Sequence, residues 1–175
     1  MAASGTRFVT YTALLLALAV LLPLALHLIN PLFARVLLPM HLPALLGGLL
    51  VGPGAGLLVG LLSPGLSYLL TGFPPTYSIA LMTVELPVYG LVAGVAYRKF
   101  GLHLYASLLL AMLFGRAAFA LSLMVLKEFI ALPYTVAEYV TGGILAAGLP
   151  GIVLQLVIIP IIVTAVKRKG ARSRY

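Results

Sequence analysis

Apolar residues occur in six long stretches along this chain, and turn-forming or charged residues separate one stretch from the next. The stretches cover residues 8–29, 36–52, 54–72, 76–97, 102–126 and 148–166. A helix needs about 20 predominantly apolar residues to cross the hydrocarbon core of a bilayer. The pattern therefore predicts an all-α integral membrane protein, with six transmembrane helices in a single membrane domain over residues 1–175.

Glycine and proline mark the breaks between the predicted helices. The first stretch ends at Asn30-Pro31 and the second at Gly52-Pro53-Gly54. Because the second break is so short, we expect the helices on either side of it to form a tight hairpin. Residues 127–147 are less apolar and contain Pro133 and Gly142-Gly143. We predict a long outer loop there, with a short interfacial helix as one option.

The composition restricts what else the chain contains. Hydrophobic residues make up 63% of the 175 residues and charged residues only 8%, whereas about 25% of the residues in a soluble domain are charged. Six membrane helices use roughly 120 residues, which leaves no room for a soluble catalytic or nucleotide-binding domain. The chain has no cysteine, so disulfides, thiolate nucleophiles and thiolate metal sites are excluded.

The positive charges indicate how the helices are oriented. The net charge is +8, and Lys and Arg collect in the cytoplasmic loops of membrane proteins. If both termini are cytoplasmic, only Arg35 and Lys127 lie in outer loops, and a basic tail at 167–175 lies inside. The eight cations on the inner side are Arg7, Arg98, Lys99, Lys167, Arg168, Lys169, Arg172 and Arg174. We therefore predict that both termini are cytoplasmic.

The N-terminal apolar run is predicted to be a retained helix. It spans about 22 residues, from Phe8 to Ile29, and is longer than the apolar core of a signal peptide. The positive charge of the chain forms no patch of the kind that binds nucleic acid. Five of the eleven cations lie instead in the tail, where they suit the cytoplasmic membrane surface and its anionic lipids.

Two ionisable residues lie deep in the apolar stretches. Glu85 falls about ten residues from the outer end of the 76–97 stretch, and Arg116 about eleven residues from the outer end of the 102–126 stretch. An unpaired charge at the centre of a bilayer costs roughly 2.5 to 3.5 kcal/mol, so we expect these residues to pair. The pair either binds a polar ligand or forms a structural bridge between two helices, and the sequence leaves both interpretations open.

Polar and aromatic residues near the outer helix ends are candidates for the wall of a cavity above this pair. Pro87 cannot donate a hydrogen bond to the Thr83 carbonyl, so we expect a helix kink beside Glu85. Tyrosine at a membrane interface often serves only as an anchor, and a histidine there is often only a packed interface residue. The candidates are Arg35, His41, Tyr68, Tyr77, Tyr134, Glu138, Tyr139 and Gln155.

Small residues recur at four-residue spacing in three of the stretches. Such faces let helices approach closely in lipid, where apolar attraction does not discriminate between neighbours. Ala13 and Ala17 lie one turn apart in the inner half of the first stretch and leave a shallow groove on one helix face. This groove serves either packing inside the bundle or docking of a partner helix. The glycines with the same spacing are Gly52, Gly56, Gly60, Gly90 and Gly94.

Several catalytic motifs are missing from the sequence. It contains no GxxxxGK[ST] phosphate-binding loop, so the chain does not hydrolyse ATP by that route. It also lacks HExxH and GxSxG motifs and any close cluster of His and acidic residues, so neither a metal centre nor a hydrolase is indicated. We expect no cofactor and no enzymatic activity in this chain.

The run from Leu38 to Pro75 reads LPMHLPALLGGLLVGPGAGLLVGLLSPGLSYLLTGFPP, and Glu85, Gly90 and Gly94 follow it. Together these features resemble the membrane-embedded substrate-binding (S) components of energy-coupling factor (ECF) vitamin transporters. The resemblance covers nearly the whole chain. It rests on six spans in 175 residues, on cytoplasmic termini, on the G-P-x-x-G turn at residues 52–56, and on the AxxxA element at residues 13–17.

The resemblance implies a bundle that captures a scarce water-soluble vitamin or vitamin precursor at the outer face of a prokaryotic plasma membrane. In that family the loaded subunit docks through its first helix onto a membrane coupling protein driven by two ABC-type ATPases, which maps partner docking onto Ala13 and Ala17. The family binds its ligand through the outer halves of helices four to six and the adjoining loops. Ligand binding maps onto Glu85, Arg116, Gln155, Tyr77, Tyr134 and Glu138, with His41 and Tyr68 as weaker extensions.

Two other functions stay open on the sequence alone. A small membrane enzyme would use Glu85 as an acid or base in a protein-lined cavity, whereas a structural or regulatory subunit would need no ligand. Copurification with a coupling protein and ATPases favours the transporter component. Turnover of a lipid or isoprenoid by the isolated chain favours the enzyme, and the absence of any bound small molecule favours the structural subunit.

Overall fold

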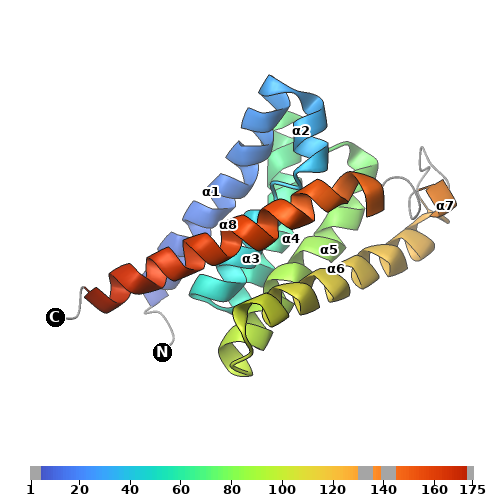
Figure 1. The fold of residues 1–175 in the computed structure, drawn as a ribbon. Helices are drawn as coiled ribbons and strands as arrows, with labels where there is room; N and C mark the ends of the chain where they lie inside the picture. Colours follow the sequence, from blue (N-terminus) through green and yellow to red (C-terminus); the bar gives the residue numbers. More distant parts are fainter. Residues whose placement is uncertain (1–4, 130–135, 139–144, 173–175) are drawn as a thin grey trace.

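The computed structural model describes residues 5–129, 136–138 and 145–172, and this part of the chain is almost entirely helical (Figure 1). No β-strand occurs in these ranges. The prediction of an all-α fold with six membrane-spanning helices is confirmed. The helical units that are long and apolar enough to cross a membrane are Gly5–Ile29, Pro31–Val51, Pro53–Thr71, Thr76–Lys99, Leu104–Leu126 and Gly148–Arg168.

The helices follow one another as long rods joined by short links, and two of the rods end in a π-helical turn. These turns are η1 and η2, which continue α3 and α5. The elements in chain order are α1 (Gly5–Ile29), α2 (Pro31–Val36), α3 (His41–Leu46), η1 (Gly47–Val51), α4 (Pro53–Thr71), α5 (Thr76–Gly94), η2 (Val95–Lys99), α6 (Leu104–Leu126), α7 (Val136–Glu138) and α8 (Leu145–Arg172).

The second span is divided into two helices near one end. Asn30 follows α1 and caps α2, because its side chain accepts a hydrogen bond from the Leu32 backbone N–H at 2.9 Å. Pro31 occupies the first turn of α2, where its missing N–H costs nothing. Leu38 then has a φ of 50°, which a right-handed helix does not allow. The chain therefore starts a new helix, α3, at His41.

Two helical segments lie where the sequence analysis expects a loop or a tail. The short helix α7 falls inside the expected outer loop at 127–147. The long helix α8 continues to Arg172 and so includes most of the expected tail at 167–175. The candidate residues Tyr134 and Tyr139 lie outside the described residues.

Glycines allow α4 and α5 to meet backbone to backbone. A Cβ at Gly56 would lie 2.6 Å from the Gly90 carbonyl oxygen, and one at Gly94 would lie 2.7 Å from the Pro53 Cα. Side-chain carbons do not approach backbone so closely, so only glycine permits this contact. Gly52 differs from the other glycines of the series. It has a φ of 150° and a Cβ there would meet nothing within 4 Å, so it serves the turn before α4.

A buried apolar core fills one half of the bundle. It joins α3, α5, α6 and α8 and includes Leu45, Tyr89, Leu108 and Ile159, which are all almost fully buried. The start of α1 and the end of α8 lie at one end of the bundle (Figure 1). We call it the basic end, because it carries Arg7, Arg98, Lys99, Lys167 and Arg168. A cavity opens at the opposite end.

The glycine contact between α4 and α5 is testable. Gly90→Ala should lower the free energy of unfolding by about 1 to 3 kcal/mol, because its methyl group would overlap the Gly56 backbone and push the helices apart. Gly65→Ala is the matched control on α4, since a Cβ there meets nothing within 4 Å. Thermal unfolding of the detergent-solubilised chain measures the stability of both variants. Equal melting temperatures for the two variants would contradict the proposed role of this contact.

Candidate functional site

A cavity of about 890 Å³ opens at the end of the bundle opposite the basic end. The C-terminal part of α1, α2 and the link to α3 form one side of it, and the α4–α5 link, α5, α6, α7 and the start of α8 contribute the rest. Its volume lies in the range of small-molecule binding sites. Most of its lining is apolar and includes Leu38, Met40, Met82 and Phe119. The few polar groups in this lining therefore determine which ligand fits.

The predicted pair of charged residues lies at the cavity. Glu85 comes from α5 and Arg116 from α6, and Arg116 Nη1 donates a hydrogen bond to Glu85 Oε1 at 3.2 Å. The Glu85 side chain is only 3% exposed and the Arg116 side chain 22%. The cost of a lone charge in an apolar interior favours such pairing. The structure thus brings these two residues together, and both line the cavity.

His41 and Tyr89 complete the surroundings of the Glu85 carboxylate. His41 Nε2 lies 3.5 Å from the same Oε1 atom, which is longer than a good hydrogen bond. The Tyr89 ring packs edge-on against the His41 ring, with centroids 4.9 Å apart, and its hydroxyl interacts with Glu85. Gly115 leaves the space that the Tyr89 ring fills, because a Cβ there would overlap the ring. Packing thus fixes the groups around the carboxylate.

Buried nitrogen atoms at the cavity have no hydrogen-bond partner among the described residues. They are both ring nitrogens of His41 and the Nη2 atom of Arg116. Gly148 at the start of α8 makes room for this guanidinium, since a Cβ there would lie 2.9 Å from Nη2. Buried polar groups in proteins are normally paired. These atoms are therefore available to the polar atoms of a ligand or of bound water.

The remaining polar and aromatic groups line the cavity closer to the ends of the helices. Arg35, Tyr77 and Glu138, all candidates from the sequence, are among its lining residues. His27 of α1 faces Phe73 of the α4–α5 link, with ring centroids 3.8 Å apart and ring planes inclined by 40°. Together these groups offer flat faces against which a ring can pack.

Two candidates from the sequence analysis lie away from the cavity lining, and a third is not placed. Tyr68 on α4 is 37% exposed, and Gln155 on α8 is 1% exposed. Neither of them lines the cavity. Both amide atoms of Gln155 lack a hydrogen-bond partner in the described part of the chain. Tyr134 lies outside the described residues.

Sequence reasoning missed several residues at the cavity. His27 lies inside the first apolar stretch, Phe73 in the link after α4, and Gly148 at the start of the last span. No spacing or motif distinguishes them, because they meet the charged pair only through the packing of distant helices. Tyr89 shares a helix face with Glu85, but the sequence could not separate its contact with the carboxylate from ordinary core packing.

The predicted docking residues lie on the outer face of α1. Ala13 and Ala17 are exposed, together with Leu14 and Leu18, whereas Ala19 is fully buried. The small-residue groove therefore faces away from the bundle. In this structure the groove is therefore not used for packing inside the bundle.

Within the described ranges, no group of three or more His, Asp or Glu side chains is arranged to hold a metal ion. At the cavity, Glu85 and Arg116 instead form an ion pair, and His41 lies beside it. Such a site suits binding of a small organic molecule through hydrogen bonds and ring contacts.

Comparison with known proteins identifies the family. The family model of the ECF transporter substrate-specific component matches residues 7–163, which include all six spans except the ends of the first and last. No curated protein and no solved structure matches the chain. Members of this family are substrate-binding subunits of transporters rather than enzymes, and their partners are ECF modules that contain ATPases. The chain therefore belongs to the ECF transporter substrate-specific component family, as a multi-pass membrane protein that binds a small-molecule substrate for transport.

Proposed function

We propose that the cavity captures a small water-soluble vitamin or vitamin precursor at the outer face of the plasma membrane, and that the loaded protein delivers it to an ATP-driven ECF coupling module. The observation that carries this proposal is a largely apolar cavity of about 890 Å³ with unpaired buried nitrogen atoms. A ligand with a flat ring and a few polar atoms matches both properties. Family membership supports the transport role.

The use of each guanidinium nitrogen supports a specific ligand chemistry. Arg116 Nη1 is engaged by Glu85, whereas Nη2 has no partner in the described part of the chain. Since guanidinium nitrogens only donate hydrogen bonds, Nη2 suits a carboxylate or a ring carbonyl of the ligand. In this arrangement Glu85 positions Arg116, and Arg116 contacts the ligand. Tyr77, His27 and Phe73 offer faces for a ring.

An acid or base role for Glu85 in a membrane enzyme has less support. Its carboxylate is 3% exposed and already has an ion-pair partner in Arg116. A general base needs a carboxylate within reach of the proton that it abstracts, whereas the atoms at this cavity that lack partners belong to Arg116 and His41. The geometry therefore favours binding over catalysis.

Substitution of Arg116 tests the binding site. Arg116→Lys keeps a positive charge beside Glu85 but removes the second N–H group, so ligand binding should weaken by about 1.5 to 3 kcal/mol. The ligand is first identified by native mass spectrometry of the purified chain, and its affinity is then measured by titration calorimetry. Tyr68→Phe is the control, because Tyr68 does not line the cavity.

A double variant separates ligand contact from a structural bridge. Glu85→Gln with Arg116→Met removes both charges together and leaves no uncompensated charge inside the bundle. It should fold and should still bind poorly. If both Arg116→Lys and the double variant bind the ligand like the wild type while only their melting temperatures fall, the pair is a structural bridge and the site assignment is wrong.

The proposed orientation places the basic end in the cytoplasm. Thr76→Cys lies at the cavity end and Leu102→Cys at the basic end, and both positions are exposed. In intact cells a membrane-impermeant thiol reagent should label Thr76→Cys and leave Leu102→Cys unmodified. The chain has no cysteine of its own, so background labelling is absent. Labelling of Leu102→Cys alone would show that the protein has the opposite orientation.

The outward-facing groove at Ala13 and Ala17 supports docking of the coupling protein on α1. Ala13→Trp or Ala17→Trp should fill this groove and abolish both assembly with the coupling protein and uptake in cells. Ligand affinity of the solitary subunit should stay unchanged, because α1 lines the cavity only with Pro23 and His27. Leu28→Trp is the matched control, at a 77% exposed position on the same helix. Full uptake by the Ala13→Trp/Ala17→Trp variant would exclude docking at this groove.

A further inference from the structure

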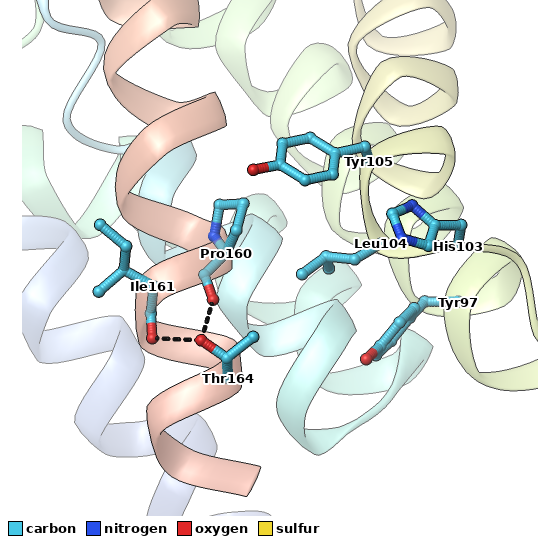
Figure 2. Close-up of a pocket in the computed structure, with 7 residues that line it drawn as sticks. All are labelled: Tyr97, His103, Leu104, Tyr105, Pro160, Ile161 and Thr164. Carbon is cyan, nitrogen blue, oxygen red and sulfur yellow. Dashed lines mark hydrogen bonds between the residues drawn. The ribbon is translucent and has the colours of Figure 1, made fainter. Parts of the chain in front are cut away.

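A second cavity, of about 480 Å³, lies at the basic end between η2, the start of α6 and the second half of α8 (Figure 2). Leu104, Pro160 and Ile161 provide its apolar surface. Ile161 is 61% exposed and Tyr105 48%, so the cavity is a groove that opens on the side of the bundle. In a membrane protein this side faces lipid. We refer to this cavity as the side groove.

Polar groups surround the apolar surface of the side groove. Figure 2 shows the side chains of Tyr97 and Tyr105 extending from one wall toward α8, with their hydroxyl groups at the tips. The His103 ring stacks beside Tyr105, with centroids 5.8 Å apart and planes inclined by 19°. Thr164 adds no free donor, because its hydroxyl donates within α8 to the Pro160 carbonyl. The tyrosine hydroxyls and the His103 ring are therefore the polar groups that the groove offers to an occupant.

A lysine places positive charge next to these hydroxyls. Lys167 Nζ donates a hydrogen bond to the Tyr97 hydroxyl oxygen. That hydroxyl keeps its own proton and so can donate to a third group. Arg98, Lys99 and Arg168 are exposed at the same end of the bundle. The side groove thus combines hydrogen-bond donors with a local excess of positive charge.

No acidic residue offsets this charge. The chain contains three acidic residues in all. Glu85 is paired with Arg116 at the other cavity, and Glu138 also lines that cavity. Glu128 follows the far end of α6 and pairs with Lys127. The basic end therefore carries an excess of positive over negative side chains at the membrane surface, where it attracts anionic lipid.

We propose that the side groove binds an anionic phospholipid from the leaflet at the basic end. One acyl chain lies along Leu104, Pro160 and Ile161, and the phosphate receives hydrogen bonds from Tyr97, Tyr105 and Lys167. A soluble anion would use the donors but not the apolar surface, and a neutral lipid would use the surface but not the charge. The proposal does not depend on the identity of the transported ligand, whose cavity is at the opposite end.

The test compares lipids of equal chain length on the detergent-solubilised full chain. Phosphatidylglycerol should raise the melting temperature more than phosphatidylcholine does, and it should stay bound in native mass spectrometry. Lys167→Gln should reduce the preference for phosphatidylglycerol roughly fivefold, the effect of one lysine near an anionic lipid. Lys127→Gln removes the same charge at the other end and should leave the preference intact.

A second variant pair tests the apolar surface of the side groove. Ile161→Trp should fill the groove and reduce binding of both lipids. Val157→Trp is the control, one turn earlier at a 53% exposed position of α8 that does not line the groove. Both variants should bind the transported ligand normally, so a loss of lipid binding by Ile161→Trp alone is not a folding defect.

Four results would overturn the proposal. The first is equal binding of the two lipids by the wild type. The second is an equal loss of preference in Lys167→Gln and Lys127→Gln, which would assign the effect to net charge. The third is that inorganic phosphate raises the melting temperature as much as phosphatidylglycerol does, which would make the occupant a soluble anion. The fourth is crosslinking of Ile161→Cys to the coupling protein in the assembled transporter, which would make the groove a protein interface.

Discussion

The ion pair between Glu85 and Arg116 is the interaction on which the site depends. A lone charge inside the membrane costs roughly 2.5 to 3.5 kcal/mol, so the two residues hold α5 and α6 together at one depth. The pair is neutral as a unit, yet within the described ranges only one terminal nitrogen of the guanidinium has a hydrogen-bond partner. The protein thereby stabilises a partly buried arginine without exhausting its hydrogen-bonding capacity, and the residue that holds the remaining donor lines the cavity.

Close helix packing in one half of the bundle leaves space for a cavity in the other. Gly56 and Gly90 let α4 and α5 meet at backbone distance, and a continuous apolar core extends from there to α8. At the opposite end, the positive φ of Leu38 separates α2 from α3. The second span therefore does not fill the space beside α5 as a straight rod would. The cavity is bounded instead by α2 and the link that follows it.

The spans and the charged pair could be predicted from the sequence, because helix length and the cost of a lone charge act on any fold of this chain. The helix face on which each candidate lies could not be predicted in this way. Gln155 and Tyr68 are candidates because of their position near the outer helix ends and the family resemblance, and neither lines the cavity. Gly52 shares the four-residue spacing of the packing glycines but forms a turn. His27 and Gly148 reach the site only through contacts between distant helices, which local patterns do not encode.

The two cavities differ in how strongly the fold requires an occupant. His41 is 2% exposed and its ring nitrogens have no hydrogen-bond partner among the described residues, so a ligand that bonds to them offsets the cost of burying them. Tyr105 is 48% exposed, and its hydroxyl is not one of the buried atoms without a partner, so it carries no such cost. Affinity at the first cavity therefore depends on matching buried donors. Affinity at the side groove depends on exposed charge, and it should fall with rising salt concentration.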